Sequence, residues 1–400
     1  MTTLDRAAAG TADTDTDLVA RAHALRPLLA AQAAQGERDG RLTEPALRAL
    51  TEAGLFLLGT PARYGGHQSG ARTLLDVGAA VSEADGSTGW VLTLGNACAW
   101  VAGLFPERAQ DEVFGTDPLA RVSGALAPTA RAERAGGGYR VSGRWAYNSG
   151  LWHADWTLLG IPLDGVDSAA DAGGTGGTGG TGGTGMALVP AADYRVEQTW
   201  THVGMRATGS NSVVAEDIFV PDHRVVPLAA TIDGVSVFAP LLTLILAAPQ
   251  LGMGRAAVRL VREAAAGKPV TGTGYQRQAD SVAFQLQLAE AALKVDTAEL
   301  HSHRAAADID SALATGRPLD RLRRARVRAD TGLAVQSVVD AIGLLLSAHG
   351  AASFASDHPL QRIWRDANVA MRHAMALPAV NYEIYGKALL GVEPNISPMI

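Results

Sequence analysis

The chain has 400 residues, of which 47% are hydrophobic and 18% are charged, and its formal net charge at pH 7 is −6. Because a single core stops growing at about 250–300 residues, we expect a globular protein of two or three packed domains. The acidic balance argues against nucleic acid or an anionic membrane as a partner, since both need clustered basic residues. The one cysteine, Cys98, excludes an intrachain disulfide framework and a cysteine-based metal cluster.

The first part of the chain is predicted to be helical. Residues 1–16, rich in Thr, Asp and Ala, are typical of a flexible, solvated tail and carry no basic-then-apolar signal pattern. Apolar residues then recur at helical spacing, which predicts an N-terminal helical domain over 17–121. Its helices are expected over 18–35, 44–52, 70–85 and 87–104, with another beginning at Pro106.

Short alternating segments separated by turn signals follow, and they predict a compact β-domain over 122–228. This domain contains a Gly/Thr-rich loop, 164–185, with a Gly-Gly-Thr repeat over 173–185. Gly repeats bury nothing and lose much backbone entropy on ordering, so we expect a flexible surface insertion. The strands are expected at 139–141, 156–161, 186–189 and 213–220.

The remaining chain, 229–400, is again predicted to be helical, and long helices joined by short links favour an antiparallel bundle. Its most apolar run, 241–249, is far shorter than the roughly 20 residues of a membrane span. We therefore expect a soluble, cytoplasmic protein with no membrane partner. The helices are expected over 241–265, 280–315, 319–347, 359–376 and 379–390.

The order α, β, α and several ordered motifs resemble the acyl-CoA dehydrogenase superfamily over nearly the whole chain after the tail. The resemblance implies a mainly α fold with a central β-domain: an N-terminal α domain, a middle β-barrel-like domain and a C-terminal four-helix bundle. The motifs are Tyr64–Gly65–Gly66, Gly143–Arg144–Trp145 through Ser149–Gly150, Gly204 to Ser210, and Arg365–Asp366–Ala367.

The sequence lacks the base that a dehydrogenase of this superfamily needs. Such an enzyme removes an acidic α-proton with a carboxylate. At the family's interval after Arg365–Asp366–Ala367 stands Ala374–Met375–Ala376, and 368–376 contains neither Asp nor Glu. The alternative location, 238–259, also contains neither. The pattern therefore favours the superfamily's flavin-dependent monooxygenases.

Two residues are implied as catalytic by this resemblance. His373, followed by Pro378, matches a histidine of the oxygenase branch that could donate to a flavin peroxide or take a phenolic proton. Ser149 matches a hydroxyl residue that addresses flavin N5. The alternatives are a packed histidine between helices and an ordinary turn serine.

Other residues are implied as cofactor contacts. Tyr147 and Asn148 would flank the flavin ring, and Trp200 would close over it. Ser210 and Asn211 would meet its phosphate end, whereas Arg277 would reach the flavin of a neighbouring subunit. Trp200 as β-domain core and Arg277 as a solvated loop residue remain the alternatives.

One departure concerns the substrate. Several oxygenases carry a histidine near the position of Cys98, but this chain has none between His67 and His153. His153 or His373 is then expected to contact the substrate. No metal site is expected, because the two-residue spacing of His301 and His303 points them to different helix faces.

The implied activity is that of the oxygenase component of a two-component monooxygenase, similar to hydroxylases of aromatic polyketide (antibiotic) pathways. A separate NAD(P)H:flavin reductase would supply FMNH2, or FADH2. The reduced flavin would react with O2 to form a C4a-hydroperoxide, which hydroxylates a phenol or quinol. A homotetramer is also implied. The alternatives are an N-oxygenase of an amino sugar or amine, an acyl-CoA dehydrogenase, and a catalytically silent scaffold.

Overall fold

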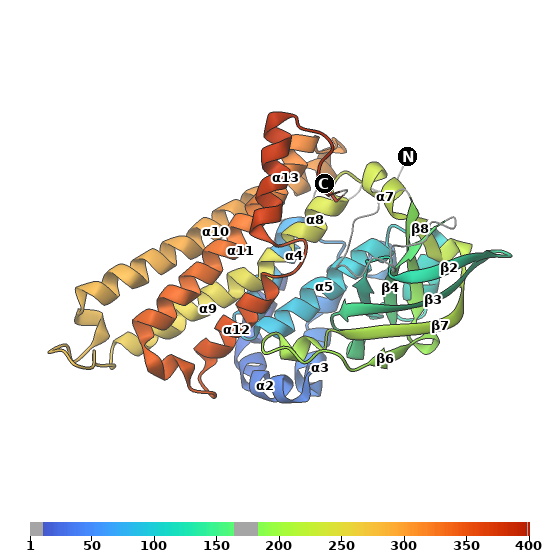
Figure 1. Ribbon diagram of the computed structural model, residues 1–400. Coiled ribbons are helices and arrows are strands. Elements are labelled where there is room, and N and C mark those ends of the chain that lie inside the picture. The colour runs from blue at the N-terminus through green and yellow to red at the C-terminus, as the bar shows by residue number, and fades with distance from the viewer. Residues whose placement is uncertain (1–10, 164–182, 398) are drawn as a thin grey trace.

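The computed structural model describes residues 11–163, 183–397 and 399–400 (Figure 1). The N-terminal helices and the β-domain lie on one side, and the long C-terminal helices extend away from them. The N-terminal helices are α1 (Thr11–Ala24), α2 (Arg26–Asp39), α3 (Glu44–Glu52), α4 (Ala71–Ser82), α5 (Gly86–Ala102) and α6 (Glu107–Phe114).

Two predictions for this region need correction. The single helix expected over 18–35 is broken at Leu25, because Pro27 can occupy only the first turn of a new helix. The expected tail, 1–16, is also too long, since α1 begins at Thr11. Residues 1–10 lie outside the described residues.

The β-domain consists of two four-stranded sheets, with strand orders β1-β4-β5-β8 and β2-β3-β7-β6. Their inner faces share a core that includes Trp145, Ile161, Val189 and Val213. The indole of Trp145 also donates to the Gly160 carbonyl at 2.7 Å. The strands are β1 (Val122–Ala125), β2 (Ala130–Ala135), β3 (Gly138–Asn148), β4 (Trp156–Pro162), β5 (Thr184–Pro190), β6 (Arg195–Glu197), β7 (Asn211–Pro221) and β8 (Val225–Pro227).

The Gly/Thr-rich loop expected over 164–185 lies mostly outside the described residues. Its last two residues belong to β5 instead of the loop, because Thr184 and Gly185 pair in register with Pro162 and Ile161 of β4. The prediction of a surface insertion stays open for 164–182.

The C-terminal helices pack against one another and against α4 and α5. Of these, α10 and α11 form the longest antiparallel pair, and α9 lies at the centre of the largest hydrophobic core. The helices are α7 (Leu228–Gly234), α8 (Phe238–Leu244), α9 (Ala247–Ala265), α10 (Val282–Thr315), α11 (Arg321–His349), α12 (Pro359–Ala370) and α13 (Pro378–Leu390).

Among the described residues, two helical stretches are long and apolar enough to cross a membrane, judged by length and composition alone. They are Phe238–Ala265 and Arg321–His349, whose most apolar windows are 83% and 56% buried inside the protein. Burial of this kind is typical of core helices, which need the same composition.

The helix expected over 359–376 ends at Ala370, and residues 371–376 form turns. The backbone N–H of Met375 donates to Nδ1 of His373 at 3.3 Å instead of continuing a helix. Asn381 of α13 donates to the Met375 carbonyl at 2.9 Å. These side-chain bonds stabilise a turn that carries His373 between α12 and α13.

Candidate active site

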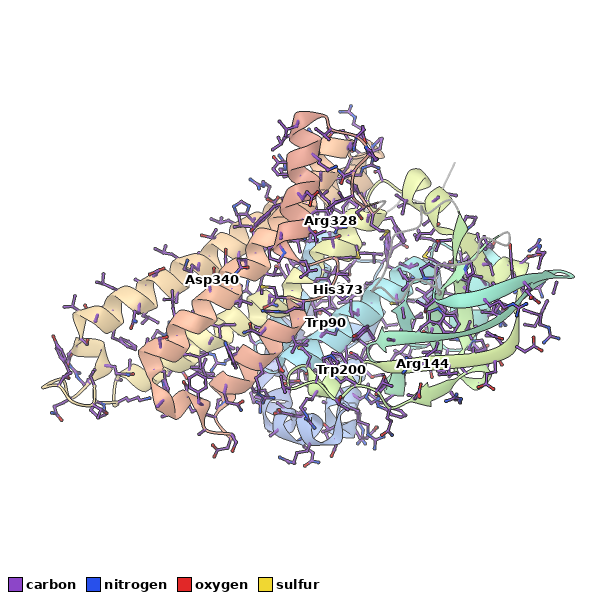
Figure 2. All side chains as sticks on the ribbon, in the orientation of Figure 1. Trp90, Arg144, Trp200, Arg328, Asp340 and His373 are labelled. Carbon is purple, nitrogen blue, oxygen red and sulfur yellow. The ribbon has the colours of Figure 1, made fainter. Side chains whose placement is uncertain are left out.

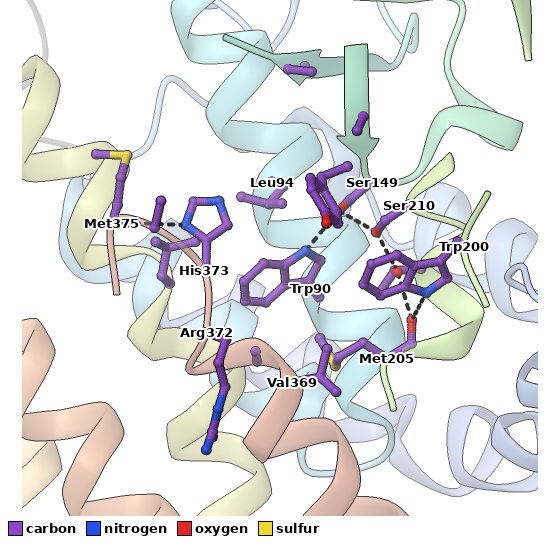
Figure 3. Close-up of a pocket in the computed structure, with 18 of the residues that line it drawn as sticks. Trp90, Leu94, Ser149, Trp200, Met205, Ser210, Val369, Arg372, His373 and Met375 are labelled. Carbon is purple, nitrogen blue, oxygen red and sulfur yellow. Dashed lines mark hydrogen bonds between the residues drawn. The ribbon is translucent and has the colours of Figure 1, made fainter. Parts of the chain in front are cut away.

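A cavity of about 860 Å³ lies where the C-terminal bundle meets α5 and the β-domain. Trp90, Trp200 and His373 come from these three regions and lie together in the middle of the molecule (Figure 2). Figure 3 shows the polar side chains that face one another across this space. The apolar wall includes Leu94, Cys98, Leu126, Leu158, Leu242 and Ile245.

His373 is half-buried, and it lines the cavity. Burial first, and then the charge of Arg328, lower the pKa of His373 to about 4. The imidazole is therefore neutral at pH 7. Because Nδ1 accepts from the Met375 N–H, the ring proton is assigned to Nε2. His373 thus offers a hydrogen-bond donor at neutral pH.

Ser149 is brought to the cavity by an irregular end of β3. The β3–β7 register shifts between Trp145 and Asn148, and Tyr147 adopts a left-handed φ of 63° there. Such bulges re-aim side chains at functional sites. Ser149 Oγ accepts from the indole N–H of Trp90 at 3.1 Å. The Trp90 ring in turn meets the His373 ring edge-on, with centroids 5.8 Å apart.

A row of hydroxyl groups continues from Ser149 (Figure 3). Ser149 Oγ lies 2.7 Å from Ser210 Oγ, which lies 2.6 Å from Thr208 Oγ1. Thr208 Oγ1 donates to the Met205 carbonyl at 2.7 Å. The Gly150 N–H also donates to the Thr208 carbonyl at 2.8 Å, so the two loops are joined at backbone and side chain.

The position of Ser210 changes one prediction. Ser210 was expected at the phosphate end of a flavin and Ser149 at its ring. Hydroxyl oxygens 2.7 Å apart cannot serve opposite ends of one flavin. Ser210 therefore belongs with Ser149, because the Gly209 turn (φ 51°) returns the chain to the β3 loop.

Three aromatic rings form one rim of the cavity. Trp200 stacks on His202 with ring centroids 3.8 Å apart, and Tyr147 lies perpendicular to Trp200 at 6.1 Å. The Trp200 indole donates to the Met205 carbonyl at 2.8 Å. Asn211 is buried, and its amide oxygen accepts the backbone N–H groups of Thr199 and Trp200 at 3.0 Å each. Asn211 thus holds the Trp200 loop and does not line the cavity.

Three other expected residues lie outside the cavity lining. The Asn148 side chain is fully buried and donates to Thr157 Oγ1 at 2.7 Å. Arg277 is exposed and pairs with Asp280 at 2.6 Å, in the connection between α9 and α10. His153 lies in a short helical turn beside Arg121, where burial lowers its pKa to about 4. His153 is not among the described residues that line the cavity, and its substrate contact stays a prediction.

A buried carboxyl group supports the Trp200 side of the site. Asp366 on α12 accepts the backbone N–H of Met205 at 2.5 Å. Burial, followed by the nearby charge of Asp85, raises the pKa of Asp366 to about 7. The Arg-Asp-Ala motif therefore acts as a support that links the C-terminal bundle to the Met205 loop.

Sequence reasoning missed Trp90, His202 and Thr208 as site residues. Thr208 entered the sequence analysis only as part of the Gly204–Ser210 motif. Cys98 lines the cavity, and burial raises the pKa of its thiol to about 12. No local pattern marks these contacts, because each depends on another segment.

The residues present fit a flavin. The cavity lies within the 300–1,000 Å³ range of small-molecule sites, is mostly apolar, and has a few converging polar groups. Trp90 and Trp200 offer aromatic faces, while Ser149 and His373 offer polar atoms. None of the described residues that line it is Asp or Glu, so a dehydrogenase's carboxylate base is missing here. Fold and site thus define a flavin enzyme of the acyl-CoA dehydrogenase fold without that base.

Comparisons with known proteins agree. The family model for the acyl-CoA dehydrogenase C-terminal domain matches residues 244–378. The HsaA oxygenase subunit of a flavin-dependent monooxygenase from Rhodococcus jostii is 32% identical, over 93% of this chain and 98% of its own. The oxygenase component of an FADH2-dependent resorcinol hydroxylase from Rhizobium is 33% identical, over 94% and 95%.

Solved structures give the same result. XiaF from Streptomyces, in complex with FADH2 and glycerol, superposes with a TM-score of 0.87 at 40% identity, over 96% of this chain and 97% of that one. The chain belongs to the family of oxygenase components of two-component flavin-dependent monooxygenases, on the acyl-CoA dehydrogenase fold.

Proposed function

We propose that this oxygenase hydroxylates an aromatic phenol or quinol. The observation that carries this proposal is the apolar cavity, which joins a neutral histidine to a row of hydroxyl groups and has no carboxylate among its described lining residues. A flat, apolar substrate suits these walls, and relatives named as hydroxylases of resorcinol and p-hydroxyphenylacetate support the substrate class.

The flavin would lie among Trp90, Tyr147, Ser149 and Trp200. Reduced flavin supplies the electrons that activate O2. Ser149 would contact N5 of the ring, and Tyr147 and Trp200 would border it. Ser210 and Thr208 would hold the Ser149 hydroxyl in place. A neighbouring subunit's Arg277 would meet a flavin phosphate.

His373 would orient oxygen in the cavity. Its Nε2–H would donate a hydrogen bond to an oxygen atom of the phenolic substrate or of the activated O2. The bond of Nδ1 to Met375 favours this donor role over proton abstraction, because Nε2 already carries the proton. The apolar wall around Cys98 and Leu158 would exclude water from the reacting atoms.

A homotetramer is also proposed. A line of exposed apolar side chains runs along α10 at spacings of four and seven residues, which keeps them on one helix face. Val282, Leu286, Leu293 and Leu300 are 61–72% exposed in the single chain. Burial of this line against another copy would remove contiguous apolar surface from water. We further propose a cytoplasmic enzyme that receives reduced flavin from a separate NAD(P)H:flavin reductase.

Turnover with an added flavin reductase tests the function. NADH, FMN or FAD, 18O2 and a panel of phenols are supplied, and products are analysed by mass spectrometry. We expect one 18O atom in a hydroxylated phenol. Electron transfer from an acyl-CoA to an artificial acceptor, without oxygen incorporation, would show the proposal to be wrong. Oxygen incorporation into amines alone would indicate N-oxygenation.

A further inference from the structure

The hydroxyl row at the cavity has a defined hydrogen-bond direction. At one end, Thr208 Oγ1 donates to the Met205 carbonyl, which cannot donate in return. Each hydroxyl carries one hydrogen. Thr208 has used its hydrogen, so it accepts from Ser210, and Ser210 in turn accepts from Ser149.

The other end of the row has the same direction. The Trp90 indole N–H is a donor only, and it points at Ser149 Oγ from 3.1 Å. Ser149 therefore receives a bond from Trp90 and gives its own hydrogen to Ser210. What remains for the cavity is a lone pair on Ser149 Oγ. In this arrangement Ser149 can accept a hydrogen bond from a ligand but cannot donate one.

We infer that this relay, Trp90–Ser149–Ser210–Thr208–Met205, makes the site select reduced over oxidised flavin. The inference rests on the proposed function, in which Ser149 meets flavin N5. Nitrogen N5 carries a hydrogen in reduced flavin and is a donor, whereas in oxidised flavin it is an acceptor. Only the reduced form matches the lone pair that Ser149 presents.

Binding of oxidised flavin at Ser149 requires the loss of one hydrogen bond within the relay. If Ser149 turns its hydrogen to N5, either the Ser149–Ser210 bond is lost or all three hydroxyls reverse. Reversal breaks the Thr208 bond to the Met205 carbonyl. In both cases one hydrogen bond disappears, which corresponds to about a fivefold difference in Kd. Ser210 and Thr208 are thus positioning residues that act through Ser149.

A selective site suits an enzyme that obtains flavin from solution. Oxidised flavin competes for the same cavity, and a bias at N5 favours the useful form. The chain obtains this bias from neutral hydroxyl groups and a backbone carbonyl. No charged group takes part in the relay.

The test compares flavin affinities without turnover. FMN and FAD are titrated into the full-length protein, oxidised in air and reduced by dithionite under anaerobic conditions. The ratio of Kd for oxidised to Kd for reduced flavin is then compared among Ser210→Ala, Thr208→Val and the parent. Ser210→Ala removes the acceptor of the Ser149 hydrogen, and Thr208→Val lets the Ser149–Ser210 bond reverse without breaking a bond to the Met205 carbonyl. In both variants Ser149 can donate to N5 at no loss, so we expect this ratio to fall about fivefold. The midpoint potential of the bound flavin should fall by about 20 mV, at 29.6 mV per tenfold change.

Ser212→Ala is the matched control. Ser212 is buried two residues from Ser210, and its hydroxyl bonds Thr199 at 2.9 Å outside the relay. We expect Ser212→Ala to leave the ratio of the two Kd values unchanged. The control therefore separates the loss of hydrogen-bond direction in the relay from a general loosening of the protein around it. Thermal melts check folding, and Thr208→Val keeps the test valid if Ser210→Ala is unstable.

The outcomes are distinct. A lower ratio in both relay variants and an unchanged ratio in Ser212→Ala would support the inference. An unchanged ratio in relay variants that still bind flavin would overturn it and leave the proposed function standing. Failure of the parent protein to bind flavin in either redox state would overturn both.

Discussion

His373 shows how burial and one backbone contact define the state of a single side chain. Its lowered pKa keeps the ring neutral, and the Met375 N–H assigns its proton to Nε2. For His373→Ala we expect flavin binding to persist while oxygen is released as hydrogen peroxide, because the cavity loses its donor. A peroxidase-coupled assay and product chromatography measure the two fates. The surface variant His23→Ala is the control. If His373→Ala divided oxygen between product and hydrogen peroxide as the parent does, His373 would have only a packing role.

Asp366 predicts a pH effect on stability. Its carboxyl group ionises near pH 3.8 when unfolded and near pH 7 when folded, so between these values the folded state holds a proton that the unfolded state has released. The contribution to stability is therefore complete below 3.8 and is lost as the pH rises through 7. In Asp366→Asn, the amide oxygen can still accept from Met205 but the titration is gone.

We expect the free energy of unfolding of Asp366→Asn, relative to the parent, to increase by about 2 kcal/mol between pH 5 and pH 8. Urea unfolding at several pH values measures this difference, in which the effects of the buried histidines cancel. Asp296→Asn, an exposed position on α10, serves as the control. A difference that stays constant with pH would contradict the prediction.

At the scale of elements, the loop between β6 and β7 depends on its close approach to α12. A Cβ on Gly204 would lie 2.4 Å from the Arg365 carbonyl oxygen, a backbone atom that cannot move freely. Gly204→Ala should therefore destabilise the protein by about 1–3 kcal/mol and weaken flavin binding, since the loop carries Trp200 and Met205. Denaturant unfolding and flavin titration test both effects.

The matched substitution is Gly136→Ala in the β2–β3 turn, where a Cβ would meet nothing within 4 Å. We expect no measurable change there. If Gly204→Ala bound flavin as the parent does, the contact between the loop and α12 would not be needed for the site.

At the scale of the whole molecule, the apolar line on α10 predicts the assembly. The double variant Leu293→Gln and Leu300→Gln should dissociate the proposed tetramer to smaller particles, because amide groups would have to be desolvated at the interface. Light scattering after size-exclusion chromatography measures the mass. Phe219→Gln, an exposed apolar residue of β7 in the β-domain, is the control. A parent protein that is already monomeric would contradict the proposal.

Local patterns in the sequence were sufficient for the order of elements, whereas the class of enzyme followed from the resemblance of its motifs to a known superfamily. The helix over 44–52 was predicted to the residue, because Thr43, Pro45 and Gly54 mark its ends locally. The absence of carboxylates over 368–376 could be read directly, and the lining of the cavity agrees with it. Composition, periodicity and capping act over a few residues, so the chain alone carries this information.

The arrangement of the site depends on packing between distant segments. Trp90 and Ser149 are 59 residues apart, and Ser149 and Ser210 are 61 apart, yet their side chains form one relay. The turn that carries His373 and the position of His153 outside the described cavity lining likewise follow from contacts between elements. A side chain's partners are set by how helices and sheets pack, and no periodicity along the chain records that geometry. The sequence therefore indicated which residues carry the chemistry, whereas the fold determined which atoms they present to the cavity.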